Sequence, residues 1–202
     1  MSRSTAVDAT PGANTTVGPY LVYSAGGLFT QHDLATNVLI KEAVWRLSGG
    51  RFQLLLPQSR ELQVLDRPDV DAYIRNEDLV WVVGADIILA RFDGVELDSG
   101  TVVEFALAKS LGKPAVILRC DFRGLSGTGR TDPYNLMVKN WPRTVEVHLD
   151  SFALWAGLLA EERQAAGSGD TFEGVLETEL GVLDKSVDEM ARRVIAGLEA
   201  VM

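Results

Sequence analysis

Short runs of apolar residues recur along the chain and are separated by stretches with helical spacing. Within each run the apolar residues follow one another without the alternation typical of half-exposed strands, which predicts strands that are buried on both faces. The expected strands are residues 20–25, 52–56, 86–92, 115–120 and 145–149.

Between these runs, apolar residues return every three to four positions, which predicts helices. We expect helices at residues 34–47, 73–83 and 100–111, the last of them ending at Gly112. Strands and helices that alternate with short links predict a doubly wound α/β fold, flavodoxin-like or Rossmann-like. Its sheet would have about five mainly parallel strands with helices on both faces, and ligands would bind beyond the carboxyl ends of the strands.

The two ends of the chain differ from this α/β region, which we place at residues 19–150. Residues 1–18 are small and polar and lack the apolar segment of a signal peptide, so we expect a disordered N-terminal arm. Residues 151–202 predict a C-terminal helical extension of two segments, 151–166 and 171–202, that packs on the domain or on a neighbouring subunit. No apolar stretch reaches the ~18 residues that cross a bilayer, so we expect a cytoplasmic protein without a membrane partner.

Acidic residues outnumber basic ones by 28 to 19, which gives a formal net charge of -9. This balance disfavours binding to a nucleic acid polymer, because like charges repel. Cys120 is the single cysteine, and His32 and His148 lie far apart in the sequence. We therefore expect no metal site and no histidine-based catalytic triad.

The stretch most able to carry chemistry is residues 93–104, which follow an expected strand and open an expected helix, and which hold four carboxylates within twelve residues. One interpretation is structural: Thr101 would be the N-cap of the helix, and Glu104 would complete a capping box. The other is chemical, since a carboxylate in the first turn of a helix stays ionised and can attack an anomeric carbon. The small residues at 99–101 would let a substrate approach the backbone closely.

Asp98, Gly100 and Glu104 form the pattern Asp-x-Gly-x-x-x-Glu, which resembles the signature of the nucleoside 2-deoxyribosyltransferase family. Three further segments are similar to the family in the same order: residues 23–29, 76–79 and 135–137. The first is similar to the family's first strand and turn, the second carries another aspartate, and the third is similar to a segment that reaches into the neighbouring subunit's site. The resemblance covers roughly residues 20–149.

The resemblance implies a catalytic α/β domain that exchanges the nucleobase of a 2'-deoxynucleoside for a free nucleobase without a cofactor. Glu104 would be the nucleophile that forms a covalent deoxyribosyl intermediate, and Tyr23 would orient it through its hydroxyl. Asp98 would hold the sugar. Asp78 would bind the base and help protonate it as it leaves.

The expected substrate-binding residues are Gly26, Phe29, Gln58, Gly100, Asn135 and Met137. By the resemblance, Asn135 and Met137 would complete the pocket of an adjacent subunit, which implies a homo-oligomer, at least a dimer, with shared sites. Gln58 follows Pro57 and is a candidate for contacting the base.

Other functions stay open on the same residues. A hydrolase of nucleosides or nucleotides would let water take the sugar from Glu104, and Arg119, Arg123 and Arg130 are cations that could contact an anion. A non-catalytic nucleoside-binding protein would bind without turnover. The Gly26-Gly27 turn matches neither the Gly-x-x-x-x-Gly-Lys nor the Gly-x-Gly-x-x-Gly pattern, which disfavours a dinucleotide-binding module.

Overall fold

The structure is a computed structural model that describes residues 18–61, 66–121, 135–166 and 171–202. The expected N-terminal arm therefore lies almost wholly outside the described residues. Within the described ranges, no helix combines the length and the apolar character needed to cross a membrane.

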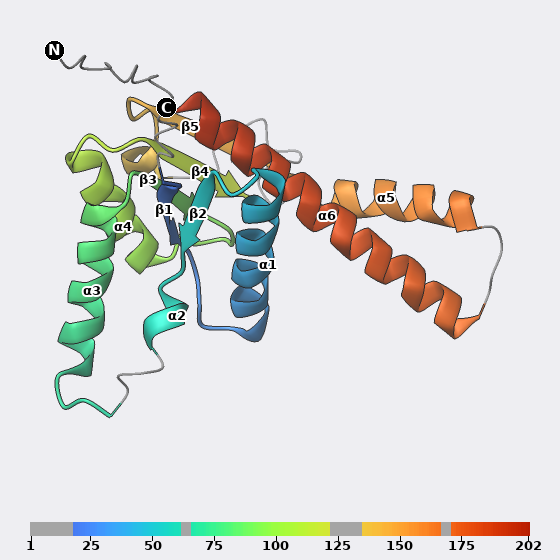
Figure 1. Cartoon of the computed structure of the whole chain (residues 1–202), viewed down its shortest axis with the longest axis horizontal. Helices are drawn as coiled ribbons and strands as arrows, with labels where there is room; N and C mark the ends of the chain where they lie inside the picture. Colours follow the sequence, from blue (N-terminus) through green and yellow to red (C-terminus); the bar gives the residue numbers. More distant parts are fainter. Residues whose placement is uncertain (1–17, 62–65, 122–134, 167–170) are drawn as a thin grey trace, which may run out of the picture.

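A five-stranded sheet in the order β2-β1-β3-β4-β5 forms the centre of the molecule, and every neighbouring pair is parallel (Figure 1). The strands are β1 (Tyr20–Ala25), β2 (Phe52–Leu55), β3 (Ile87–Arg91), β4 (Ala115–Arg119) and β5 (Thr144–His148). The predicted doubly wound α/β fold is confirmed, and the strand boundaries agree to within a residue or so at most ends.

Helices cover both faces of this sheet (Figure 1). They are α1 (Gln31–Leu47), α2 (Gln58–Glu61), α3 (Val70–Gly84), α4 (Ser99–Ser110), α5 (Ser151–Ala166) and α6 (Phe172–Ala200), with a short 3₁₀ helix, η1 (Leu136–Val138). Helices α1 and α6 pack on one face, whereas α3, α4 and η1 pack on the other.

The alternation of side chains along each strand divides the core between the two faces. On β1, Val22 points to the α1 and α6 face, whereas Tyr23 points to the α3 and α4 face. Phe92 and Phe105 meet edge to face on this second side, with ring centroids 5.8 Å apart. The middle of α4 thus packs against the residue that follows β3.

The C-terminal half of α6 belongs to the core of the domain. Met190, Val194 and Leu198 are buried among residues of the central sheet. At Gly197 an added Cβ would lie 3.1 Å from the side chains of Val116 and Val147, so the helix approaches β4 and β5 closely here. The N-terminal half of α6 pairs with α5 and projects away from the sheet as a hairpin (Figure 1).

Candidate active site

The candidate site lies at the carboxyl edge of the sheet, where β1 and β3 are neighbours. In a doubly wound sheet of this order, the direction of the crossovers reverses between these two strands, and ligands bind in the crevice that results. Tyr23 lies near the end of β1, and Glu104 lies on α4, the helix that follows β3. Residues far apart in the sequence therefore meet at the place that the topology favours.

Tyr23 and Glu104 are joined directly. The Tyr23 hydroxyl donates a hydrogen bond of 2.5 Å to Oε1 of Glu104. Tyr23 is completely buried, and Glu104 is partly buried. Because the tyrosine ring is fixed in the core, its hydroxyl is a rigid donor that sets the direction of the carboxylate.

Helix α4 begins earlier than a capping box at Thr101 would require. Asp98 is the N-cap, and its Oδ2 accepts hydrogen bonds from the backbone N–H of Thr101 at 2.7 Å and from its hydroxyl at 2.8 Å. The interpretation of Thr101 as N-cap is therefore wrong, because an aspartate three residues earlier takes that role.

This start of α4 also corrects the expected position of Glu104 on the helix. Since α4 begins at Ser99, Glu104 lies in the second turn and not in the first. The influence of the helix dipole falls off beyond the first turn, so the dipole contributes little at Glu104. The hydrogen bond from Tyr23 is the local interaction that stabilises the carboxylate. At Gly100 an added Cβ would approach Oδ2 of Asp98 to 3.3 Å, so a glycine leaves room for the cap.

Arg91 holds the turn that follows β1. Its guanidinium donates to the carbonyl oxygen of Gly27 at 3.2 Å and to Oδ1 of Asp33 at 3.1 Å. Asp33 in turn forms a capping box with Thr30 at the start of α1. An added Cβ at Gly26 would lie 3.3 Å from Cβ of Arg91, which explains the need for a small residue at this position.

The amide of Gln58 is bound to α1. Its Nε2 donates to the carbonyl oxygen of Leu34 at 3.1 Å, and its Oε1 accepts from Asn37 at 2.8 Å. Asn37 also donates to the carbonyl oxygen of Gly27 at 3.2 Å. Gln58 thus anchors the segment after β2 to the turn after β1, and an amide that makes two such bonds still has one N–H and one lone pair for a base.

The loop after β3, which leads to Asp98, is fixed by two side chains from β4 and its end. Arg119 is buried and donates to the carbonyl oxygens of Phe92 at 2.6 Å and Gly94 at 3.0 Å. Asp121 accepts from the backbone N–H of Gly94 at 3.0 Å. The guanidinium of Arg119 therefore donates to the protein backbone, and its contact with an anion stays a prediction. Arg123 and Arg130 lie outside the described residues.

Asp93 is the partly buried carboxyl of this loop. Its Oδ1 accepts a hydrogen bond of 2.6 Å from the backbone N–H of Cys120. Burial raises the pKa of Asp93 above its ordinary value, and the hydrogen bond from Cys120 and the positive charge of Arg91 oppose that rise. The pKa of the Cys120 thiol is raised to about 12, mainly by burial.

The remaining expected site residues lie at different depths. Asp78 is partly buried on α3, the helix that packs beside α4. Phe29 is 79% exposed in the turn after β1. Asn135 caps η1 by accepting a hydrogen bond of 3.0 Å from the N–H of Met137, and both residues are exposed. The structure thus brings Tyr23, Glu104 and the capping Asp98 to one end of α4, whereas Phe29, Asn135 and Met137 project into solvent.

Sequence reasoning missed the side chains that hold the loops around this site: Asp33, Asn37, Arg91 and Asp121. One signal was present, because Arg91 and Arg119 each end an otherwise apolar strand. A cation at that place needs acceptors, and the carbonyl oxygens of the next loop are the nearest ones. The partners themselves follow only from the fold.

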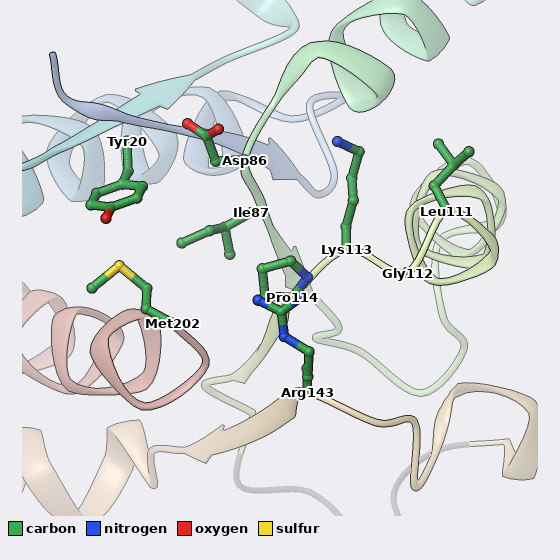
Figure 2. Close-up of a pocket in the computed structure, with 9 residues that line it drawn as sticks. All are labelled: Tyr20, Asp86, Ile87, Leu111, Gly112, Lys113, Pro114, Arg143 and Met202. Atoms are coloured by element: carbon green, nitrogen blue, oxygen red, sulfur yellow. The ribbon is translucent and has the colours of Figure 1, made fainter. Parts of the chain in front are cut away.

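Two surface hollows lie away from Glu104. The first, of about 370 Å³, is at the amino-terminal edge of the sheet and is lined by Tyr20, Asp86, Lys113 and Arg143 among others (Figure 2). Its polar groups tie the strand starts together, since Asp86 accepts from the N–H of Leu21 and Lys113 donates to the carbonyl oxygen of Ala85. The second, of about 320 Å³, lies between α1 and β2. Among the described residues, no group of His, Cys, Asp and Glu side chains could hold a metal ion.

Comparison with known proteins agrees with this fold. The model of the nucleoside 2-deoxyribosyltransferase family matches residues 22–137, more than half of the 202 residues. A 2-deoxyribosyltransferase from the psychrotolerant bacterium Bacillus psychrosaccharolyticus is 20% identical, with 66% of this chain and 88% of that chain covered and a TM-score of 0.50. At this identity the likeness shows a shared fold.

A second solved structure, a conserved protein from Enterococcus faecalis V583, is 25% identical. The match covers 64% of this chain and 92% of that chain, with a TM-score of 0.49. A search of the curated proteins finds no significant match.

Proposed function

The chain belongs to the nucleoside 2-deoxyribosyltransferase family, and from this premise we propose that it exchanges the nucleobase of 2'-deoxynucleosides through a covalent intermediate on Glu104. The observation that carries the proposal is the hydrogen bond from the buried Tyr23 hydroxyl to the Glu104 carboxylate. A nucleophile needs a fixed direction of attack, and a donor anchored in the core supplies it.

In the first half of the proposed reaction, a carboxylate oxygen of Glu104 forms a bond to C1' of the sugar. The bond between C1' and the base nitrogen breaks, and its electron pair leaves with the base. Asp78 is the proposed donor of the proton that the departing base takes up. Asp98 holds the sugar, either through its second carboxylate oxygen or through the helix start that it caps.

In the second half, a nitrogen of an incoming base attacks C1' from the opposite face and displaces Glu104. The proton lost by this base returns to the proposed acid. Two inversions at C1' give overall retention, as in other double-displacement reactions at an anomeric carbon. The two carboxylic groups divide the tasks of nucleophile and acid, which requires different environments for them.

We also propose that the exposed Asn135 and Met137 on η1 contact substrate in the site of a neighbouring subunit. Their exposure and the position of η1 beside α4 support this, because side chains that project from the rim of one site can reach another. The proposed substrate-binding set further includes Gly26, Phe29, Gln58 and Gly100. We place the protein in the cytoplasm, where nucleoside salvage takes place.

The decisive experiment is incubation with 2'-deoxyinosine, with and without adenine, followed by chromatography of the products. Formation of 2'-deoxyadenosine only in the presence of adenine supports the transferase. Catalytic release of hypoxanthine without an acceptor base, well beyond the one equivalent per site that forms the covalent intermediate, would instead show a hydrolase. Binding of 2'-deoxyinosine without any product would show a nucleoside-binding protein, and either result would refute the proposal.

A further inference from the structure

Two side-chain amides, those of Asn37 and Gln58, are bonded to each other and to the backbone at the carboxyl edge of the sheet. Nδ2 of Asn37 donates to the carbonyl oxygen of Gly27 at 3.2 Å and to Oε1 of Gln58 at 2.8 Å. Nε2 of Gln58 donates to the carbonyl oxygen of Leu34 at 3.1 Å. Both side chains are partly buried, so water competes for these bonds less than it does at the surface.

The two backbone carbonyl groups fix which way round each amide lies. An amide can be turned by 180° so that its oxygen and nitrogen change places, and only the hydrogen bonds distinguish the two arrangements. A carbonyl oxygen only accepts, so Nε2 of Gln58 faces Leu34 and Nδ2 of Asn37 faces Gly27. Oε1 of Gln58 then faces the second N–H of Asn37. Turning either amide over would set an oxygen against an oxygen.

This amide pair is connected to the candidate site through the turn after β1. The carbonyl oxygen of Gly27 accepts from Arg91, at the end of β3, as well as from Asn37. Gln58 begins α2 shortly after the end of β2, the strand beside β1, so its amide lies at the same edge of the sheet as Glu104. Helices α1 and α4 cover opposite faces of the sheet. The crevice at this edge is therefore bordered by elements from both faces.

One N–H and one lone pair of the Gln58 amide stay available to a ligand, because within the described part of the chain this amide makes only the two bonds given above. Since the amide cannot turn over freely, it offers these two groups in a fixed order. Adenine and cytosine present an amino donor beside a ring-nitrogen acceptor, whereas hypoxanthine and uracil present an oxo acceptor beside an N–H donor. In a given pose, such an amide can form two hydrogen bonds with one of these classes and not with the other.

We propose that Asn37 is a positioning residue for base selection, which holds the Gln58 amide so that the protein distinguishes amino bases from oxo bases. This rests on the proposed function, in which Gln58 contacts the base. In this arrangement a nucleoside lies across the carboxyl edge of the sheet, with its sugar at Glu104 and its base at Gln58, beside α1. Asn37 does not touch the substrate and acts through Gln58.

The test is isothermal titration calorimetry with 2'-deoxyadenosine and 2'-deoxyinosine, which differ only at positions 1 and 6 of the purine. The full chain with Glu104→Gln is used, so that neither nucleoside is consumed during the titration. One nucleoside should bind roughly 10- to 100-fold more tightly than the other, the discrimination typical of a pair of hydrogen bonds to a base edge. Equal dissociation constants, or binding of neither nucleoside, would overturn the proposal.

The second step adds Asn37→Asp to the same chain. A carboxylate only accepts, so it requires the N–H group of Gln58 at the place where the native residue meets its oxygen. A hydrogen bond to this charged acceptor is stronger than the bond to the Leu34 carbonyl, so we expect the amide to turn over. The ratio of the two dissociation constants should then change at least 10-fold, towards or past unity. A loss of affinity by the same factor for both nucleosides would show a merely structural role and refute the positioning role.

Two further variants complete the design. Asn37→Leu is neutral and of similar size, and it keeps the test decisive if circular dichroism shows that Asn37→Asp does not fold. It should lower the ratio about 3-fold, because only the Leu34 carbonyl then holds the amide. The matched control is Gln53→Glu, which adds the same charge at an exposed side chain of β2 and should leave the ratio unchanged. An equal change of the ratio in this control and in Asn37→Asp would contradict the role of Asn37.

The outcome is separable from that of the proposed reaction, because binding and transfer are measured apart. Transfer of deoxyribose by the unmodified chain, together with equal binding of the two nucleosides, would refute base selection through Asn37 alone. Unequal binding without any transfer would refute the proposed reaction alone.

Discussion

At the scale of single residues, the candidate site is a partly buried carboxylate that accepts a hydrogen bond from a tyrosine of the core. Tyr23 is as deeply buried as any residue of the molecule, yet its hydroxyl reaches Glu104 across 81 positions of sequence. The sequence pattern could predict both residues through the family resemblance. Their contact could not be predicted from local spacing, because it depends on how β1 and α4 are packed.

The first prediction concerns the nucleophile. Glu104→Gln keeps the size of the side chain and its ability to accept from Tyr23, but the amide cannot form the glycosyl ester. We expect transfer between bases to fall by ~10³-fold or more. Steady-state kinetics with 2'-deoxyinosine and adenine measure this loss, and activity close to that of the unmodified protein would exclude Glu104 as the nucleophile.

The second prediction separates orientation from chemistry. Tyr23→Phe removes only the hydroxyl, and a hydrogen bond to a charged group contributes about 1.5–3 kcal/mol, so kcat should fall roughly 10- to 100-fold. The loss should appear in kcat more than in KM, because the contact is to the proposed nucleophile. Tyr20→Phe, at an exposed tyrosine at the start of β1, is the control and should leave kcat unchanged.

The third prediction concerns Asp93 and pH. Because its pKa is raised in the folded protein, the folded state takes up a proton in the interval between the ordinary and the raised value. The free energy of unfolding should therefore decrease as pH rises through this interval, and Asp93→Asn should remove that decrease.

Urea denaturation between pH 4 and pH 8 would measure this effect, with Glu96→Gln, an exposed carboxyl of the same loop, as the control. The asparagine keeps an oxygen that can accept from the N–H of Cys120. A pH profile of Asp93→Asn that follows the unmodified protein would contradict the assignment.

At the scale of elements, the apolar runs predicted the strands well because each strand of this sheet is covered on both faces. The start of α4 was harder, since Asp98 and Thr101 are both good N-caps and stand three residues apart. Local pattern cannot decide between two such caps. The order of the strands and the division of helices between the faces follow from packing in three dimensions.

The fourth prediction uses two glycines in helices. Gly197→Ala should destabilise the protein by about 1–3 kcal/mol, because the added methyl would press on Val116 and Val147 in a filled core. Gly157→Ala on α5 meets nothing within 4 Å and should stabilise by about 0.5–1 kcal/mol through helix propensity. Thermal unfolding of both variants tests the pair, and a stabilising Gly197→Ala would show that α6 can move away from the sheet.

At the scale of the whole molecule, one helix of the C-terminal extension, α6, is buried in the core along its second half and exposed along its first half. The sequence change after Leu149 left open whether the extension packs on the domain or on a neighbouring subunit. The buried half of α6 shows that the sheet face needs this helix, because α1 alone does not cover β4 and β5. Pattern alone could not divide α6 in this way, since apolar residues at helical spacing run through both halves.

The fifth prediction follows from this division. A chain shortened to residues 1–150 should lose cooperative unfolding, because removing α6 exposes Val116, Leu118 and Val147 to water. Circular dichroism melts and binding of a hydrophobic dye would measure this. The full-length Leu180→Glu chain, altered only on the hairpin, is the control and should melt cooperatively. A cooperative transition of the shortened chain would show that the extension is dispensable.

The attachment of Tyr23 to the core has a consequence for altering substrate range. The orientation of the proposed nucleophile is set by packing on the α3 and α4 face, whereas the turn with Phe29 and the segment with Asn135 stand in solvent on other elements. Because we propose that these exposed segments contact substrate, we expect that varying them changes which bases bind without disturbing the proposed nucleophile. A library of variants that is meant to accept new bases should therefore vary the exposed segments around Phe29 and Asn135. It should leave the residues that pack on the Tyr23 ring unchanged.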